Sequence, residues 1–543
     1  MAAFSWIARW PAPCSERQRA VIDAHPTRAR RLPLRACSRS AELRPEVAAM
    51  RIAIICTYTH PTRLRLKERS VMQSWVGELL AALCPPDAEI EIYNEKETDI
   101  PLDRDWDIVF FSYLHAYYEH TKVLSALLRR RGITTVAGGR HASHYVADAE
   151  RWFDAVVVGD PEANVPALFA DFARGELKKR YTLAAVAPAQ IPAWRYDLVD
   201  YAQNKVRLPA IEASRGCPFT CNFCVLTGWE RYRYRPVADV VRDIEHHMRF
   251  NENYFGVLDN AFGFVDNNLG GSPKYLRELC DALIPLKKSW GCSLTWNVLQ
   301  DEDLVRHMAR AGCRYVYTGL ESLDPDSIAS MNKGQNRLKE TGTTLRRVFE
   351  AGILASFGLL VGSDGDTDAY LERLPEYVDE LGTAAVTFLG IVCPYPETPF
   401  FETVAREGRL LPGATSRDFD GYTLCHRPKK LDPSATVEHF KRLCQELGSF
   451  SSLAKHTWAQ LKLSSAPRYR AAILNGAIER RSIIAPLANP ARTFIAGQDP
   501  IEPWDVARMA ELGIEPQRID TVLPREQTVR LQIRAPRAVK EAA

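Results

Sequence analysis

Residues 214–229 read S-R-G-C-P-F-T-C-N-F-C-V-L-T-G-W. The three cysteines of this stretch, Cys217, Cys221 and Cys224, have the spacing C-x3-C-x2-C within one short loop. Thiolates this close in sequence can converge on one inorganic centre, and an iron–sulfur cubane normally takes four of them. Three thiolates therefore leave one iron without a protein ligand, and a substrate or cosubstrate can bind there. We call residues 217–227 the cluster loop.

A zinc site, or three unrelated buried thiols, would also place cysteines here. Structural zinc sites close with four ligands, usually as paired knuckles. No further C-x2-C pair follows Cys224, and His246 and His247 fall on an expected helix. The spacing therefore favours a cluster whose metal ligands and catalytic residues are the three cysteines, without a second, auxiliary cluster.

The composition excludes several classes of protein. With 543 residues the chain is long enough for two or three domains. Its 70 basic and 67 acidic residues nearly balance, so charge gives no argument for a nucleic-acid partner. No apolar run is long enough to cross a membrane, so we expect no transmembrane segment. The 13 cysteines are mostly scattered, which fits a reducing cytoplasm.

Residues 1–49 are rich in arginine and proline and have little apolar periodicity, so we expect a disordered leader. An arginine-rich leader could be an organellar transit peptide. The alternative, which we prefer, is a natural start at Met50, because the first apolar strand begins directly after it.

Residues 50–175 alternate short apolar segments with helical ones, which predicts a doubly wound parallel sheet. In such sheets ligands lie at the carboxyl ends of the strands. Gly138, Gly139 and Gly159 fall at these ends, where glycine lets backbone approach a ligand, although a tight turn alone would also explain them. The expected strands are 52–56, 88–93, 107–112, 133–137 and 155–158, and the expected helices 70–83, 117–131, 143–152 and 163–174.

After an expected linker at 176–207, residues 208–400 repeat the strand–helix pattern six times. This predicts a partial (β/α)6 barrel, with catalytic groups at the strand ends. Asp259 and Asn260 follow the second expected strand, Glu321 the fourth and Gly362 the fifth. The expected strands are 208–213, 254–258, 293–298, 315–319, 355–361 and 385–392, and the expected helices 237–250, 273–286, 301–311, 338–351 and 367–381.

The cluster loop, with Phe223 just before its last cysteine, resembles that of the radical S-adenosylmethionine (SAM) superfamily. The resemblance implies a [4Fe–4S] cluster whose open iron chelates SAM and cleaves it to a 5′-deoxyadenosyl radical. It also implies that Asp259 and Asn260 lie near the SAM amino group, although a literal G-G-E is absent there. Glu321, in G-L-E-S, would approach the SAM ribose or methionyl group, and Gly362 would let its strand pass the adenine.

The first domain, with its turns V-A-G-G-R-H-A-S and V-G-D-P-E-A, resembles the cobalamin-binding domain of B12-dependent radical SAM enzymes. That implies cobalamin as a further cofactor. The D-x-H-x-x-G signature that supplies a histidine to cobalt is absent here, and relatives exist with and without bound cobalamin, so the sequence leaves cobalamin binding open. Residues 401–543 predict a mostly helical cap and a frayed tail, with helices at 400–407, 436–447 and 454–461. The segment from Phe419-Asp-Gly-Tyr422 through Pro428-Lys-Lys430 resembles the C-terminal region of a radical SAM subgroup that includes enzymes of hopanoid biosynthesis, and this resemblance implies that the cap touches substrate.

The expected function is therefore radical SAM chemistry, most simply cobalamin-dependent methylation of an unactivated carbon in a small-molecule or lipid substrate. Without cobalamin, the alternatives are oxidation, rearrangement or ring closure. A non-catalytic iron–sulfur carrier or B12 sensor is a distant alternative, because a carrier needs no open iron site. The expected partner is a reducing electron donor of the flavodoxin or ferredoxin type, and no nucleic acid.

Overall fold

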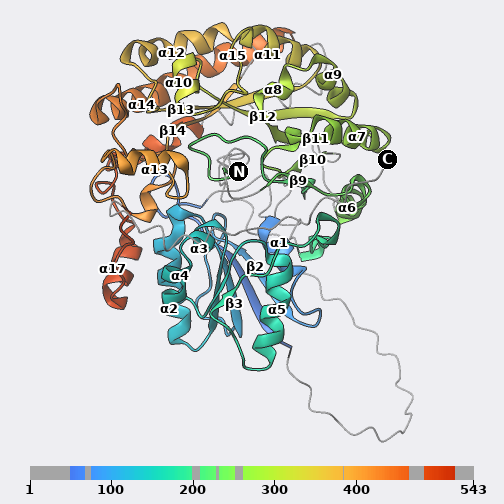
Figure 1. Cartoon of the computed structure of the whole chain (residues 1–543), viewed down its shortest axis with the longest axis vertical. Helices are drawn as coiled ribbons and strands as arrows, with labels where there is room; N and C mark the ends of the chain where they lie inside the picture. The colour runs from blue at the N-terminus through green and yellow to red at the C-terminus, as the bar shows by residue number, and fades with distance from the viewer. Residues whose placement is uncertain are drawn as a thin grey trace, which may run out of the picture.

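Two parallel six-stranded sheets form the body of the molecule, and Figure 1 shows them in two lobes, one above the other. Hydrogen bonding pairs every strand of either sheet in parallel with its neighbours. The computed structural model describes residues 49–67, 75–198, 208–227, 231–250, 261–382, 385–463 and 482–519.

The first sheet has the strand order β2-β1-β3-β4-β5-β6. Its inner strands are apolar throughout because helices cover both faces. In β1, Ile52 and Ile54 belong to one buried cluster, while Ala53 and Ile55 belong to another on the opposite face. The strands are β1 (Arg51–Cys56), β2 (Glu89–Asn94), β3 (Ile108–Ser112), β4 (Thr134–Gly138), β5 (Ala155–Val157) and β6 (Arg180–Tyr181).

Helices pack on both faces of this sheet, so it is doubly wound as predicted. Leu80 of α1 and Leu168 of α5 lie in one cluster, whereas Leu124 of α2 and Val146 of α4 lie in the other. The expected helix 143–152 is broken at Tyr145, whose ψ of 51° ends α3 before α4 begins. The helices are α1 (Trp75–Ala81), α2 (Tyr118–Arg130), α3 (Arg140–His144), α4 (Val146–Trp152) and α5 (Pro161–Ala173).

The second sheet has the order β7-β10-β11-β12-β13-β14, which is the strand sequence of a partial (β/α)6 barrel. Its buried residues join one large core with the helices around it. The strands are β7 (Ala210–Ile211), β10 (Ala261–Phe264), β11 (Ser289–Leu294), β12 (Cys313–Glu321), β13 (Leu354–Val361) and β14 (Ala385–Ile391). The helices between them are α6 (Val237–Phe250), α7 (Pro273–Leu283), α8 (Trp296–Leu299), α9 (Glu302–Arg310), α10 (Pro325–Ser330), α11 (Thr341–Glu350) and α12 (Asp368–Glu380).

One expected barrel strand lies outside the described residues, and another differs from the structure. The expected strand 254–258 lies outside the described residues, and the strand that pairs with β7 is β10, further along the chain. The expected strand 293–298 is wrong in its position, since β11 ends at Leu294 and α8 begins at Trp296. The expected strands 315–319, 355–361 and 385–392 are confirmed by β12, β13 and β14.

The C-terminal region is mostly helical and contacts both domains. Helix α14 packs against α12 and β14 of the barrel, and α17 lies beside α2 of the first domain (Figure 1). The described elements are α13 (Pro399–Arg406), α14 (Pro433–Leu447), α15 (Phe450–Leu463), α17 (Pro503–Leu512) and the 3-10 helices η7 (Ser416–Asp418) and η8 (Ser482–Ala488). The predicted fold class is thus confirmed in its three parts. None of the helices in the described ranges combines the length and the apolar character needed to cross a membrane.

Candidate active site around the cluster loop

The cluster loop is entered through a short antiparallel pairing of β8 (Ser214–Arg215) with β9 (Arg233–Tyr234). Gly216 follows with a φ of +79°, which favours glycine. The buried Asp266, two residues after β10, accepts hydrogen bonds from the Ser214 hydroxyl (2.5 Å), the Ser214 amide and the Ala213 amide (3.2 Å). Asp266 therefore fixes the chain immediately before the first cysteine.

Two of the three cysteine thiols accept hydrogen bonds from side-chain amides in other parts of the barrel. Cys221 is buried, and Cys217 and Cys224 are half-buried. The Asn268 side-chain amide donates to Cys217 Sγ at 3.4 Å, and the Gln335 side-chain amide donates to Cys221 Sγ at 3.2 Å. Hydrogen bonds to sulfur are among the features that set the potential of an iron–sulfur cluster.

The electrostatic environment of the thiols combines burial with one buried cation. Burial raises the pKa of Cys221 and of Cys224, while Lys333 lowers both. Among the described residues, no group of three or more His, Cys, Asp or Glu side chains could hold one metal ion. A cubane takes its thiolates on separate irons, so its sulfur ligands need not converge on one point as the ligands of zinc do. The three thiols, two of which accept amide hydrogen bonds, are a donor set that fits an iron–sulfur cluster.

The predicted residue Phe223 anchors the loop on an apolar cluster. Its ring packs against a group formed by α10, α13 and the end of β14, and Lys333 Nζ lies 5.7 Å from the ring centroid. This contact gives Phe223 a structural role, and its contact with a cofactor stays a prediction.

Glu321 lies at the end of β12, where the sequence predicts it. Its φ of +68° is unusual for a residue with a side chain. The Glu321 carboxylate forms an ion pair with Lys333 Nζ at 2.5 Å, and the side chains of Lys333 and Glu321 are 8% and 12% exposed. The structure therefore brings Glu321 and the cluster loop together through Lys333, because Lys333 also acts electrostatically on Cys221 and Cys224.

The remaining predicted barrel residues have different outcomes. Asp259 and Asn260 lie outside the described residues, and the polar residues after the described second strand are Asp266 and Asn268. Gly362 has a φ of +88°, its amide donates to Asp366 (2.8 Å), and a Cβ would lie 3.1 Å from the Thr436 methyl of α14. This packing accounts for glycine at 362, and a role at the adenine stays a prediction.

Of the three glycines predicted at the strand ends of the first domain, Gly138 ends β4, and Gly139 and Gly159 have positive φ. Gly139 has a φ of +94° and a ψ of −176°, and a Cβ there would come within 2.9 Å of the Tyr113 carbonyl oxygen. Gly159 has a φ of +80°, and its amide donates to the Ser143 hydroxyl at 3.0 Å. Turn geometry thus requires glycine at 139, and this agrees with the alternative explanation that the glycines serve a tight turn. Cofactor contact by Gly138, Gly139 and Gly159 stays a prediction.

The strand ends of the first domain contact the cluster loop directly. Arg140, next to the predicted Gly139, donates to the Val225 carbonyl within the loop at 2.9 Å. Asp160, next to Gly159, pairs with Arg233 of β9 at 2.5 Å, and Glu162 pairs with the buried Arg215 at 2.8 Å. The two domains therefore meet at the point where each would bind its cofactor.

Buried polar groups line the same junction. Glu397, after β14, accepts a 2.8 Å hydrogen bond from His115 Nε2 of the first domain. Burial alone would raise the pKa of Glu397, but His115 and His144 lower it to about 2. The Tyr113 hydroxyl, His141 Nδ1 and Glu397 Oε2 have no hydrogen-bond partner among the described residues. Such atoms are the kind that a bound polar cofactor satisfies.

The stretch 231–235, R-Y-R-Y-R, is partly exposed at Arg231 and Tyr234 and packs into the molecule at Arg233 and Arg235. Arg235 is buried and donates to Asp243 at 2.6 Å, and Arg233 makes the interdomain pair with Asp160. Tyr234 stacks on Tyr275 with ring centroids 4.2 Å apart. Arg233 thus joins the barrel to the first domain, and Arg235 is paired within the barrel, because each has a carboxylate partner.

Comparison with known proteins agrees with this geometry. Residues 211–378 match the profile of the radical SAM superfamily. The bacteriochlorophyllide d C-12(1)-methyltransferase of Chlorobaculum tepidum is 26% identical over 388 residues, which cover 69% of this chain and 83% of that protein. The hopanoid C-2 methylase of Rhodopseudomonas palustris is 26% identical over 229 residues, which cover 41% of each chain.

Among solved structures, the fold is similar to the radical SAM methyltransferase TsrM from Kitasatospora setae, solved with cobalamin and a [4Fe–4S] cluster. The TM-score is 0.56 at 15% identity, covering 80% of this chain and all of that one. At this identity the likeness shows the fold, which comprises both the sheet domain and the barrel. Residues 211–378 are thus similar to the radical SAM superfamily, and the fold, a sheet domain joined to a partial barrel, is similar to that of a radical SAM methyltransferase solved with cobalamin and a [4Fe–4S] cluster.

Proposed function

We propose that the chain is a cobalamin-dependent radical SAM methyltransferase that acts on an unactivated carbon of a small-molecule or lipid substrate. When bound, the cluster supplies the electron that cleaves SAM to a 5′-deoxyadenosyl radical, and cobalamin supplies the methyl group. The observation that carries the proposal is the Arg140 hydrogen bond to Val225, which joins the cobalamin-type turn to the cluster loop.

The chain's own residues have three tasks in this proposal. Cys217, Cys221 and Cys224 hold the cluster, and Asp266 fixes the chain that enters the loop. The pairs Asp160–Arg233 and Glu162–Arg215 hold the two domains together, because charged hydrogen bonds of this kind are strong when partly buried. Holding both cofactors in one enclosed junction would keep a reactive radical away from water.

The first domain suits a bulky cofactor at its strand ends. Its turns bring backbone close to that edge, and Tyr113, His141 and Glu397 each present a buried polar atom without a partner in the described part of the chain. The names of the relatives support methylation of tetrapyrroles or lipids as the candidate chemistry. An electron donor of the flavodoxin or ferredoxin type and a cytoplasmic location complete the proposal.

The test begins with uptake of the corrinoid. The full chain is reconstituted anaerobically with iron and sulfide, incubated with hydroxocobalamin, and desalted before its visible spectrum is recorded. It is then given SAM and titanium(III) citrate. Reductive cleavage of SAM leaves 5′-deoxyadenosine, whereas loss of the SAM methyl group leaves S-adenosylhomocysteine, and mass spectrometry separates the two products.

We expect a retained corrin spectrum and S-adenosylhomocysteine formation that depends on the corrinoid. A chain that forms 5′-deoxyadenosine but takes up no corrinoid would contradict methyl transfer by cobalamin. In that case the radical would serve oxidation, rearrangement or ring closure.

A further inference from the structure

Residues 330–336, between α10 and α11, lie between the cluster loop and the end of β12. On one side they hold the loop, and on the other they hold the strand that carries Glu321. The contacts on the loop side are Asn222 N to Met331 O (3.1 Å), Asn222 Nδ2 to Ser330 O (2.8 Å), Asn332 Nδ2 to Thr220 O (2.8 Å) and Gln335 Nε2 to Cys221 Sγ (3.2 Å). On the strand side, Asn336 Nδ2 donates to the Gly319 and Leu320 carbonyls, each at 2.9 Å.

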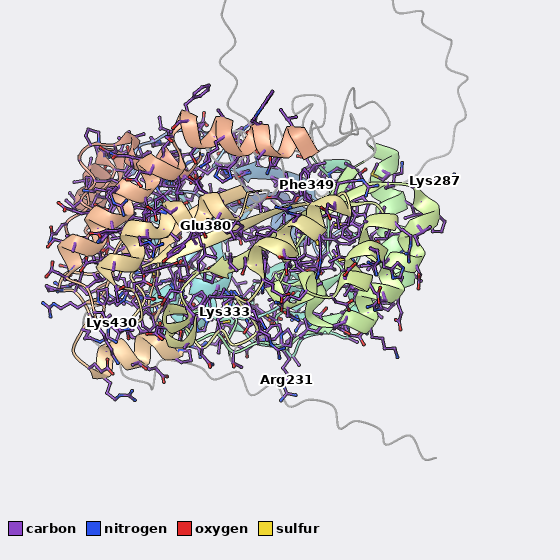
Figure 2. The ribbon with its side chains drawn as sticks, turned by 90° about the horizontal axis from the view of Figure 1, so that it is seen from above. Arg231, Lys287, Lys333, Phe349, Glu380 and Lys430 are labelled. Carbon is purple, nitrogen blue, oxygen red and sulfur yellow. The ribbon has the colours of Figure 1, made fainter. Side chains whose placement is uncertain are left out.

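Two side chains of this segment face the cysteines. Lys333 (Figure 2) carries a buried ammonium group that interacts electrostatically with Cys221 and Cys224 while it pairs with Glu321. Gln335 donates an N–H to the sulfur of Cys221. The Lys333 ammonium lies 5.7 Å from the ring centroid of Phe223 in the cluster loop, and the Gln335 amide contacts the sulfur of Cys221, so the segment brings a positive charge and an N–H donor to the cysteines from outside the loop.

The physical consequence concerns the charge of the cluster. Reduction adds one electron, so a nearby cation and hydrogen bonds to sulfur stabilise the reduced form more than the oxidised form. Burial strengthens this effect, because the interaction between charges is screened less than in water. Glu321 offsets part of the Lys333 charge, because its carboxylate pairs with the ammonium and acts on Cys221 with the opposite sign. Gln335 has no such counter-charge among its described contacts.

We propose that residues 330–336 tune the redox behaviour of the cluster: the Lys333 ammonium and the Gln335 amide raise its reduction potential, which lets a donor reduce it for SAM cleavage. The inference rests on the radical SAM assignment and is independent of cobalamin.

The experiment measures the midpoint potential of the reconstituted full chain by redox titration monitored by electron paramagnetic resonance, without SAM or corrinoid. We expect Lys333→Met and Gln335→Leu each to shift the midpoint to a more negative potential at unchanged iron content. Lys333→Arg, which keeps the charge, should stay near the wild-type value. Lys430→Met is the matched control, since Lys430 is an exposed lysine that pairs with Asp326.

Wild-type midpoints in both Lys333→Met and Gln335→Leu would overturn the proposal. An equal shift in Lys333→Arg and Lys333→Met would also contradict it, because charge would then not be the cause. If Lys333→Met loses iron, Gln335→Leu decides, and loss of iron in both variants would show that the segment only holds the loop. None of these outcomes depends on whether the chain binds a corrinoid.

Discussion

At the scale of the residue, Asp266 fixes the chain that leads into the cluster loop, although it is not itself a ligand of the cluster. Its two oxygens accept from two backbone amides and one hydroxyl at the start of the loop. Burial raises the pKa of Asp266 to about 7, although the Ser214 and Ala213 donors oppose this shift. A side chain with three donors around it and no solvent has little freedom, so it determines where the loop begins.

Asp266→Asn should therefore loosen the loop. An amide nitrogen would replace one acceptor oxygen and leave a backbone N–H unpaired, which costs about 1–3 kcal/mol. We expect a lower free energy of unfolding in denaturant titration and a lower iron content after reconstitution. Asp281→Asn is the control, because the Asp281 side chain is 70% exposed. Equal iron content in Asp266→Asn and wild type would contradict this role.

The three cysteines could be identified from the sequence because their spacing is local. Lys333, Gln335 and Asn268 could not, because they reach the thiols from positions between 51 and 114 residues away only once the barrel is closed. A polar run such as 330–336 also looks like an ordinary turn between two helices. The charge and the hydrogen bonds around a site are thus set by the fold rather than by any local pattern.

At the scale of the element, the turn between β4 and α3 connects the first domain to the cluster loop. Gly139 occupies a conformation that is nearly exclusive to glycine, and the next residue, Arg140, reaches Val225. The turn therefore combines a steric requirement with an interdomain contact.

Gly139→Ala should destabilise the chain by about 1–3 kcal/mol, because a Cβ would meet the Tyr113 carbonyl at 2.9 Å. Gly132→Ala provides the control, since Gly132 also has a positive φ but no atom within 4 Å of a Cβ. Denaturant titration should give a larger loss for Gly139→Ala than for Gly132→Ala. Equal losses of unfolding free energy would contradict this prediction, because the chain would then relieve the contact with the Tyr113 carbonyl without a loss of stability.

The strand pattern shows what the sequence can and cannot locate. Strands β1, β3 and β13 are continuous apolar runs, and their positions agree with the prediction. In β11, apolar residues alternate from Trp290 to Leu294, and the same alternation continues through Trp296 and Val298 into α8. A period of two therefore continues past the real end of the strand, and this explains why the predicted strand lies too late.

At the scale of the whole molecule, a buried hydrogen bond between His115 and Glu397 joins the two domains. His115 lies at the start of η2 (His115–Tyr117) in the first domain, and Glu397 follows the last barrel strand. Their side chains are 4% and 3% exposed. Replacing one partner of a buried hydrogen bond weakens the bond or leaves the other partner unsatisfied, which costs about 1–3 kcal/mol.

Glu397→Gln should therefore lower the free energy of unfolding, and the loss should depend on pH. Because the pKa of Glu397 is lowered to about 2 in the folded chain, its stabilisation is fully present above the unfolded value of 4.5 and is lost as pH falls toward 2. Urea titrations should show a difference between wild type and variant at pH 5 that shrinks below pH 4.5. Glu376→Gln, at a mostly exposed side chain, should show no such trend. A difference that does not change with pH would contradict the pairing.

The central claim is that Cys217, Cys221 and Cys224 hold a cluster that cleaves SAM, and one measurement tests it most directly. Wild-type chain and Cys221→Ala are reconstituted anaerobically and given SAM and titanium(III) citrate. The 5′-deoxyadenosine formed from SAM is then measured by mass spectrometry. We predict formation by the wild type and none by the variant, because two thiolates cannot hold a cubane with a defined open iron. No 5′-deoxyadenosine from the wild type, or equal amounts from both, would contradict the claim.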